Sequence, residues 1–198
     1  MSAAAVEPPC DDKSALFAEA ERLAEKLPGY RIEIIGGELT VTPPPDGPHG
    51  EALGELIFAF AAVRRGETRT IPEIGIWLPD GPDDYAVPDL AVVDADYREH
   101  LIAHNSYDPA VFRLVVEVTS SNYGNDLKKK VAAYAIAKVP VYVIVDRRHE
   151  RIHVLTEPIA NEYDKHRAHA PGELVQLPES IGGRVELDVT AILEAARP

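Results

Sequence analysis

Two carboxylates that lie far apart in the chain are candidates for binding one divalent cation. Asp89 follows a proline at the head of the apolar segment LAVVD, and Glu117 interrupts the apolar segment RLVVEVTS at 113–120. A lone ionised carboxylate is very costly to bury, so either a cation meets Glu117 or the strand end opens into a site. If the two segments form neighbouring strands, both carboxylates can face one point. Two oxygen ligands completed by water suit Mg²⁺ or Mn²⁺.

The residues after Glu117 supply a cation for the same site. A bound divalent ion can polarise a phosphoryl oxygen and lower the pKa of a water molecule, and phosphodiester hydrolysis also needs stabilisation of developing charge. Asp126, Lys130 and Tyr134 are spaced four apart, so on a helix they stack along one side. Lys130 lies at the edge of the apolar stripe of that helix. We expect it to lean toward the sheet end and to orient the attacking water or stabilise the transition state.

Each of these residues also has a purely structural interpretation. Asp89 after a proline is typical of a turn. Glu117 can be held by an ion pair with Arg113 or Lys130. Lys130 is one of three consecutive lysines and can be a solvated helix residue. The joint order and spacing of the three residues, rather than any one of them, favours a site.

Other polar residues near these segments have weaker claims. His49 lies in a predicted loop before a helix and could contact a phosphate or a water, or simply act as a loop or capping residue. Thr119 and Ser120 could contact a phosphate or a metal-bound water. Asp126 is most simply a helix N-cap, and Tyr134 is most simply a core aromatic with a solvated hydroxyl.

The chain pattern predicts the elements that position these residues. Residues 111–120, 126–138 and 141–146 read as strand, helix and strand, which implies a right-handed crossover in a partly parallel sheet. The fold class is therefore α/β, or mixed α+β with a mixed central sheet. The other expected helices are 14–27, 48–63 and 188–196. The other expected strands are 30–35 and 38–42, which form a hairpin, 68–78, which is bent or at an edge because of Pro72, 87–94, and 151–155.

Composition indicates an ordinary globular protein. Of 198 residues, 45% are hydrophobic and 27% are charged, and there is a single cysteine, Cys10. A disulfide framework or a cysteine-rich zinc site is therefore excluded, and a reducing cytoplasm is the expected location. No segment approaches the ~20 apolar residues of a membrane span, and the N-terminus lacks the pattern of a secretion signal. We expect a flexible leader at 1–12 and a single domain at 13–198.

The net charge of −13 argues against broad, nonspecific binding of nucleic acid. It leaves room for a local basic path. The cationic clusters are the lysines at 128–130 and the segment RRHER at 147–151.

Four ordered segments resemble the putative restriction endonuclease family, which belongs to the PD-(D/E)XK nuclease superfamily. The resemblance spans roughly Tyr30 to Val154. It rests on VPD at 87–89, VVEVTS at 115–120, DLKKKVAAY at 126–134 and VPVYVIVD at 139–146.

The resemblance implies a restriction-endonuclease-like core and a set of site residues. Asp89 and Glu117 match the metal ligands of the superfamily, with the carbonyl of Val118 as a third. The superfamily pattern expects a lysine two residues after the glutamate, where this sequence has Thr119. In this family the lysine is displaced to the following helix, which implies Lys130. Family members often carry a histidine where this chain has His49.

Together these observations predict a Mg²⁺- or Mn²⁺-dependent endonuclease acting on DNA. A homodimer is expected, because cutting two strands needs two sites and Ile136 would face outward from its helix. The alternative is a catalytically weak or inactive binding or assembly module on the same fold. A third interpretation is a cation-binding structural protein without a nucleic-acid partner.

Overall fold

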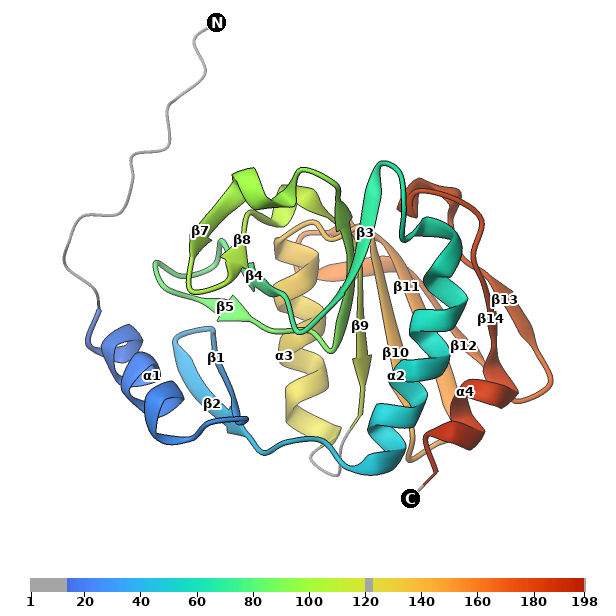
Figure 1. Ribbon diagram of the computed structural model, residues 1–198, viewed down its shortest axis with the longest axis horizontal. Coiled ribbons are helices and arrows are strands. Elements are labelled where there is room, and N and C mark those ends of the chain that lie inside the picture. Colours follow the sequence, from blue (N-terminus) through green and yellow to red (C-terminus); the bar gives the residue numbers. More distant parts are fainter. Residues whose placement is uncertain (1–13, 120–122, 198) are drawn as a thin grey trace, which may run out of the picture.

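The structure is a computed structural model that describes residues 14–119 and 123–197, and side chains are described for 14–119 and 128–197. The expected leader at 1–12 and Ser120 lie outside these residues. Four α-helices occur in the described residues (Figure 1). They are α1 (Ala15–Lys26), α2 (Gly47–Ala59), α3 (Tyr123–Ile136) and α4 (Val189–Ala195).

A mixed six-stranded sheet forms the centre of the fold, and we call it the central sheet. Its strands are β3 (Thr68–Pro72), β6 (Leu90–Asp94), β9 (Phe112–Val118), β10 (Val141–Asp146), β11 (Arg151–Ile159) and β12 (Glu162–His169). They are ordered β12-β11-β10-β9-β6-β3. Strands β9 and β10 are parallel and joined by α3, as the crossover pattern predicts, while β6 runs antiparallel to β9.

A second six-stranded sheet has the order β2-β1-β5-β4-β8-β7. Its strands are β1 (Arg31–Ile35), β2 (Glu38–Thr42), β4 (Gly75–Trp77), β5 (Tyr85–Ala86), β7 (Leu101–Ala103) and β8 (Ser106–Tyr107). The predicted hairpin of β1 and β2 is confirmed, with Ile35 opposite Glu38. A small antiparallel pair, β13 (Leu174–Gln176) and β14 (Glu186–Asp188), completes the strands.

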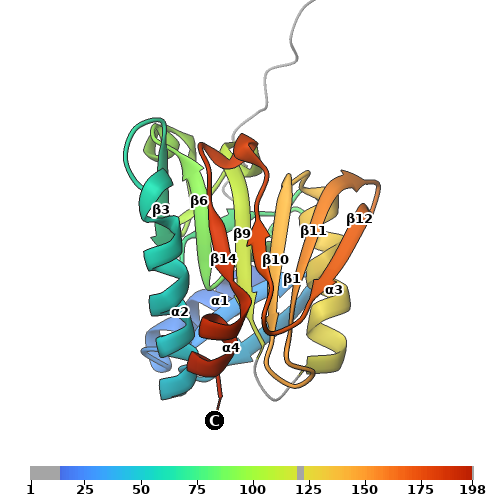
Figure 2. The same ribbon diagram turned by 90° about the vertical axis from the view of Figure 1, so that its right-hand side faces the viewer.

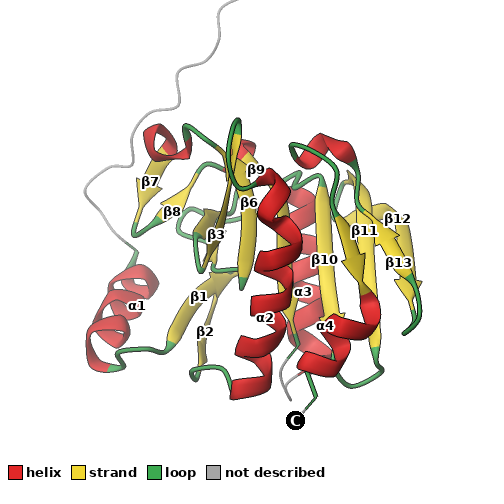
Figure 3. Ribbon diagram, turned by 45° about the vertical axis from the view of Figure 1, so that its right-hand side comes forward, coloured by secondary structure: helices red, strands yellow, loops and turns green. Residues whose placement is uncertain are grey.

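The central sheet is covered on both faces, which explains the near-continuous apolar composition of its strands. Side chains alternate along a strand, so Val116 and Val118 of β9 face α2, α4 and β14, while Val115 faces α3 and β4. Figure 2 shows α2, α4 and β14 in front of the central sheet and α1 and α3 behind it. Figure 3 shows the same layering by secondary structure. By this alternation Glu117 points to the α3 side.

The expected strand at 68–78 divides between the two sheets, and its expected edge position is confirmed for β3, which lies at the edge of the central sheet. β3 belongs to the central sheet and β4 to the second sheet. Between them, Glu73 has a φ of 51°, in the left-handed region that residues other than glycine rarely adopt. Proline at position 72 cannot donate to a sheet ladder, so the pairing ends there and the chain turns.

Two helices begin earlier than predicted. The side chain of Asp46 accepts the backbone N–H of His49, so α2 begins at Gly47, one residue before the expected helix at 48–63, and the loop position expected for His49 is wrong because it lies in the first turn. Because α3 begins at Tyr123, Asp126 lies within the helix and not at its N-cap.

Ile136 is half-buried, and the homodimer stays a prediction.

Within the described residues, no helix combines the length and apolar character that crossing a bilayer requires.

The N-cap of α2 provides a test of how this helix is held. The Asp46→Ala protein should lose about 1 kcal/mol in free energy of unfolding, measured by urea denaturation at neutral pH. Hydrogen bonds from Arg147 and from the N–H of His49 lower the pKa of Asp46. A lowered folded-state pKa stabilises the protein above the unfolded value of about 3.9, and this contribution disappears as the pH falls through the folded value. The difference between the two proteins should therefore shrink below about pH 4.

Asp46→Asn is the matched control, since asparagine caps a helix about as well as aspartate but carries no charge. It should retain most of the stability. A loss equal to that of Asp46→Ala would assign the effect to the partly exposed ion pair with Arg147 instead of the cap.

Candidate active site

The two predicted metal ligands lie on adjacent strands at one end of the central sheet. Asp89 immediately precedes β6, and Glu117 is the second-last residue of β9, with Leu90 opposite Val116. The backbone N–H of Val118 donates to Oδ2 of Asp89 at 2.7 Å. This bond ties the Asp89 carboxylate to the strand that carries Glu117. Both side chains are buried, with only 1% of Asp89 and 8% of Glu117 exposed.

The predicted lysine reaches the same place from α3. Nζ of Lys130 donates to Oε1 of Glu117 at 2.9 Å, and the hydroxyl of Tyr134 donates to the same oxygen at 2.7 Å. Lys130 is only 8% exposed, so it is not the solvated lysine of the alternative interpretation. The structure therefore brings Asp89, Glu117 and Lys130 together.

Strand β1 contributes two charged residues that the sequence analysis missed. Oε1 of Glu33 lies 2.9 Å from Nζ of Lys130 and accepts the backbone N–H of Val87 at 2.8 Å. Arg31 forms a charged hydrogen bond with Oδ1 of Asp89, and its Nη1 lies 3.6 Å from Oε2 of Glu117. A signal did exist in the sequence, because two opposite charges spaced two apart share one face of a strand.

His49 approaches the site from the first turn of α2. Its Nε2 lies 3.4 Å from Oδ1 of Asp89, too long for a strong hydrogen bond. That nitrogen is buried without a hydrogen-bond partner in the described residues. The hydroxyl of Thr119 binds the backbone at the end of β10, donating to the carbonyl of Val145 and accepting the N–H of Arg147.

Ionisation in the site is set by burial and by the two cations. Burial opposes the charged form of Asp89, but the His49 and Arg31 side chains outweigh it and lower its pKa to about 2. Burial dominates at Glu117, where it exceeds the attraction of Lys130 and raises the pKa to about 7. Burial works against a charged Lys130 as well, yet Glu117 and Glu33 raise its pKa above the ordinary value. Two carboxylates with pKa values driven apart are typical of functional sites.

The ion-pair interpretation of Glu117 is confirmed for one of its two suggested partners. Arg113 lies at the other end of β9 and pairs with Asp94 at 2.7 Å, so it does not reach Glu117. Lys130 is the cation that does.

In each of the two carboxylates, one oxygen is hydrogen-bonded within the site and the other faces Arg31. Oδ2 of Asp89 and Oε1 of Glu117 are bound by the backbone of Val118 and by Lys130 and Tyr134. The remaining oxygens, Oδ1 of Asp89 and Oε2 of Glu117, both face Arg31. Over the described side chains, no group of three or more His, Cys, Asp or Glu residues is arranged around a metal position. At this point the described side chains of Asp89 and Glu117 offer two carboxylate oxygens that face the same cationic group.

Comparison with known proteins identifies the class of protein that this fold and site define. The family model described as "Putative restriction endonuclease" (Uma2) matches residues 17–190, and the chain belongs to this family. Among solved structures, the fold is similar to that of a putative nuclease belonging to DUF820 from Anabaena variabilis, with a TM-score of 0.67 and 17% sequence identity. The similarity covers 83% of this chain and 90% of that one. The comparison with curated proteins found no match.

Replacing Lys130 tests the buried charge network. The Lys130→Met protein should lose about 3 to 5 kcal/mol in free energy of unfolding, because the change leaves two buried carboxylates without their shared cation. Burial raises the pKa of Glu117, so ionising this residue in the folded state is unfavourable and the loss should grow with pH. Chemical denaturation at pH 6 and pH 8 measures both effects.

Lys129→Met is the matched control on the same helix. Lys129 is exposed and pairs with the exposed Glu38, so its replacement should change stability by less than about 0.5 kcal/mol. Equal losses for the two variants would contradict a special role for the buried lysine.

Proposed function

We propose that this protein is a metal-dependent endonuclease that hydrolyses phosphodiester bonds in DNA. One observation carries the proposal. Oδ1 of Asp89 and Oε2 of Glu117, on adjacent strands, converge on a single cationic group, with the ammonium of Lys130 bound to the other oxygen of Glu117. Membership of the restriction endonuclease family supports the same reaction class.

The residues present fit a small, hard divalent cation. Two carboxylate oxygens that already face one positive charge are suitable ligands for Mg²⁺ or Mn²⁺, which retain several waters when bound by one or two carboxylates. We assign Asp89 and Glu117 as these ligands, with the carbonyl of Val118 as the expected third. A bound ion of this kind would polarise a phosphoryl oxygen and lower the pKa of a coordinated water.

Lys130 has the properties required of a positioning and charge-stabilising group. Its ammonium is held by Glu117 and Glu33 at 2.9 Å each, which fixes its place, and both carboxylates keep it protonated. A fixed positive charge in a site from which water is largely excluded stabilises the charge that develops on a phosphorane-like transition state. In this proposal Lys130 also orients the attacking water.

A binding or assembly module without catalysis is the second candidate function. The observation that favours it is the charge balance of the site, since Asp89 and Glu117 each already contact a cationic side chain. A network of this kind can serve structure alone.

Replacement of Glu117 separates the two candidates. Purified protein with Mn²⁺ should nick supercoiled plasmid, and Glu117→Gln should reduce the cleavage rate by at least about a hundredfold. The same variant should bind Mn²⁺ more weakly in isothermal titration calorimetry, because an amide is a poorer ligand than a carboxylate.

Glu38→Gln is the control, since Glu38 is an exposed acid on β2 away from Asp89 and Glu117 in the described contacts. Cleavage and metal binding should both be unchanged in this variant. If wild-type protein binds DNA but cleaves neither plasmid nor single-stranded DNA with Mn²⁺ or Mg²⁺, the binding module is the correct function. If Glu117→Gln binds Mn²⁺ as tightly as the wild type does, Glu117 is not a metal ligand.

A further inference from the structure

Arg31 occupies the position at which the two metal-ligand oxygens converge. Its guanidinium contacts Oδ1 of Asp89 through Nη2 and lies 3.6 Å from Oε2 of Glu117 through Nη1. The opposite oxygen of each carboxylate is already bound by other groups of the protein. The guanidinium is therefore the counter-charge for the same two oxygens that a divalent cation would need.

A guanidinium and a divalent cation are incompatible at this position. Within a few ångströms, and away from bulk water, two positive charges repel strongly. When all five groups are ionised, the three carboxylates of Asp89, Glu117 and Glu33 and the two cations Arg31 and Lys130 leave the site with one net negative charge. Adding a divalent ion reverses that to one net positive charge, which matches the single charge of a phosphodiester.

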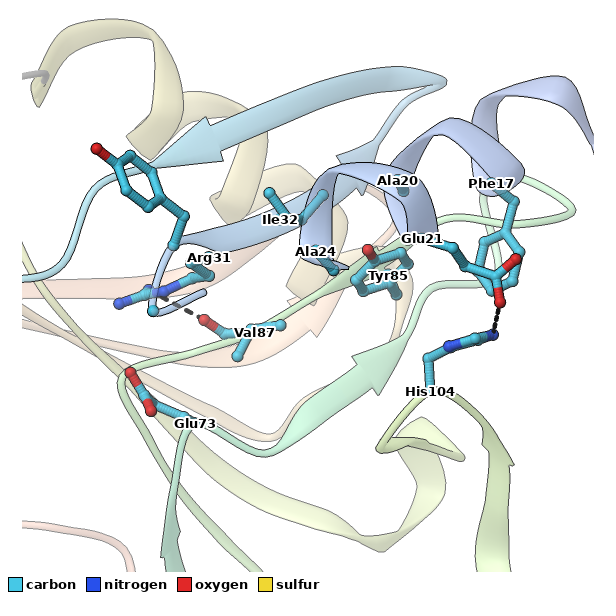
Figure 4. A pocket seen from close by; sticks show the side chains of 12 residues that line it. Phe17, Ala20, Glu21, Ala24, Arg31, Ile32, Glu73, Tyr85, Val87 and His104 are labelled. Carbon is cyan, nitrogen blue, oxygen red and sulfur yellow. Dashed lines mark hydrogen bonds and ion pairs between the residues drawn. The ribbon is translucent and has the colours of Figure 1, made fainter. Parts of the chain in front are cut away.

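Arg31 is incompletely satisfied where it lies and has space beside it. Its Nε is buried and has no hydrogen-bond partner in the described residues, although Nη1 donates to the carbonyl of Val87 at 3.0 Å. The side chain also lines a cavity of about 380 Å³ between α1, β1 and β5. Figure 4 shows this cavity, with Arg31 at one end, Glu73 near it, and the ion pair of Glu21 and His104 at the far end. An arginine with an unused donor and an adjoining cavity can take a second position.

We propose that Arg31 is a catalytic residue with two positions, and this inference rests on the proposed function. In the metal-free protein it neutralises Asp89 and Glu117. When a divalent cation binds to those oxygens, the guanidinium leaves them and binds the substrate phosphate, for which its planar pair of N–H donors is well suited.

Two measurements on the Arg31→Met protein test the proposal. The first position of Arg31 opposes binding of the metal, whereas its second position favours binding of DNA, so the two affinities should change in opposite directions. Removing the competing charge should tighten Mn²⁺ binding by about tenfold in isothermal titration calorimetry. Removing the phosphate ligand should weaken binding of a fluorescein-labelled DNA duplex about fivefold at saturating Ca²⁺, measured by anisotropy. Ca²⁺ replaces Mg²⁺ here because its longer, less rigid coordination disfavours cleavage.

Arg113→Met is the control, since Arg113 forms a more exposed ion pair with Asp94 at the opposite end of the same two strands. Both affinities should be unchanged. Arg31→Lys keeps the charge but loses the planar donor pair, so Mn²⁺ affinity should stay near the wild-type value while duplex affinity falls. If circular dichroism shows that Arg31→Met does not fold, the two affinities of Arg31→Lys are used to test the proposal instead.

The outcomes are distinguishable from failure of the proposed function. If the wild type binds Mn²⁺ and Arg31→Met binds it equally or more weakly, the displacement is wrong while the metal centre stands. If duplex affinity at saturating Ca²⁺ is unchanged in both Arg31 variants, the phosphate contact is wrong. If neither wild type nor Arg31→Met binds Mn²⁺, the metal centre fails and this inference fails with it.

Discussion

The cost of burying charge governs this structure. Asp89, Glu117, Glu33 and Lys130 are each at most 8% exposed, and together with Arg31 they form one network. Each carboxylate would be prohibitively expensive in an apolar interior without a cation or hydrogen bonds. The network therefore requires that β1, β6, β9 and α3 stay together. The site is therefore complete only when the two sheets are packed against each other.

The site lies between layers, not within one layer. The central sheet provides Asp89 and Glu117, α3 provides Lys130 and Tyr134, and the second sheet provides the charges of β1. Each layer has its own apolar core against its neighbour, so the polar residues lie where these cores end. Rigid elements on three sides hold the donor atoms in place, which is a general requirement of a catalytic site.

The sequence predicts the central part of this arrangement well. The parallel pairing of β9 and β10 follows from a strand, helix and strand pattern, and Lys130 is found from four-residue spacing. Arg31 and Glu33 were missed because YRIEII alternates polar and apolar residues, as an ordinary half-exposed strand does. Only the tertiary structure reveals that α3 lies against the polar face. Pro72 indicated a bend or an edge position in 68–78, but the division of this segment between two sheets was missed, since a backbone turn at Glu73 leaves no periodic signal.

The position of β1 also sets a limit on how far the chain can be shortened. The hairpin of β1 and β2 precedes every strand of the central sheet, so a fragment beginning after Thr42 would keep that sheet, all its crossovers and three of the network residues. Such a fragment would nevertheless lose Arg31, which pairs with Asp89, and Glu33, the second carboxylate that binds Lys130. Trimming the chain from its N-terminus would therefore dismantle this charge network before it removed any strand of the central sheet.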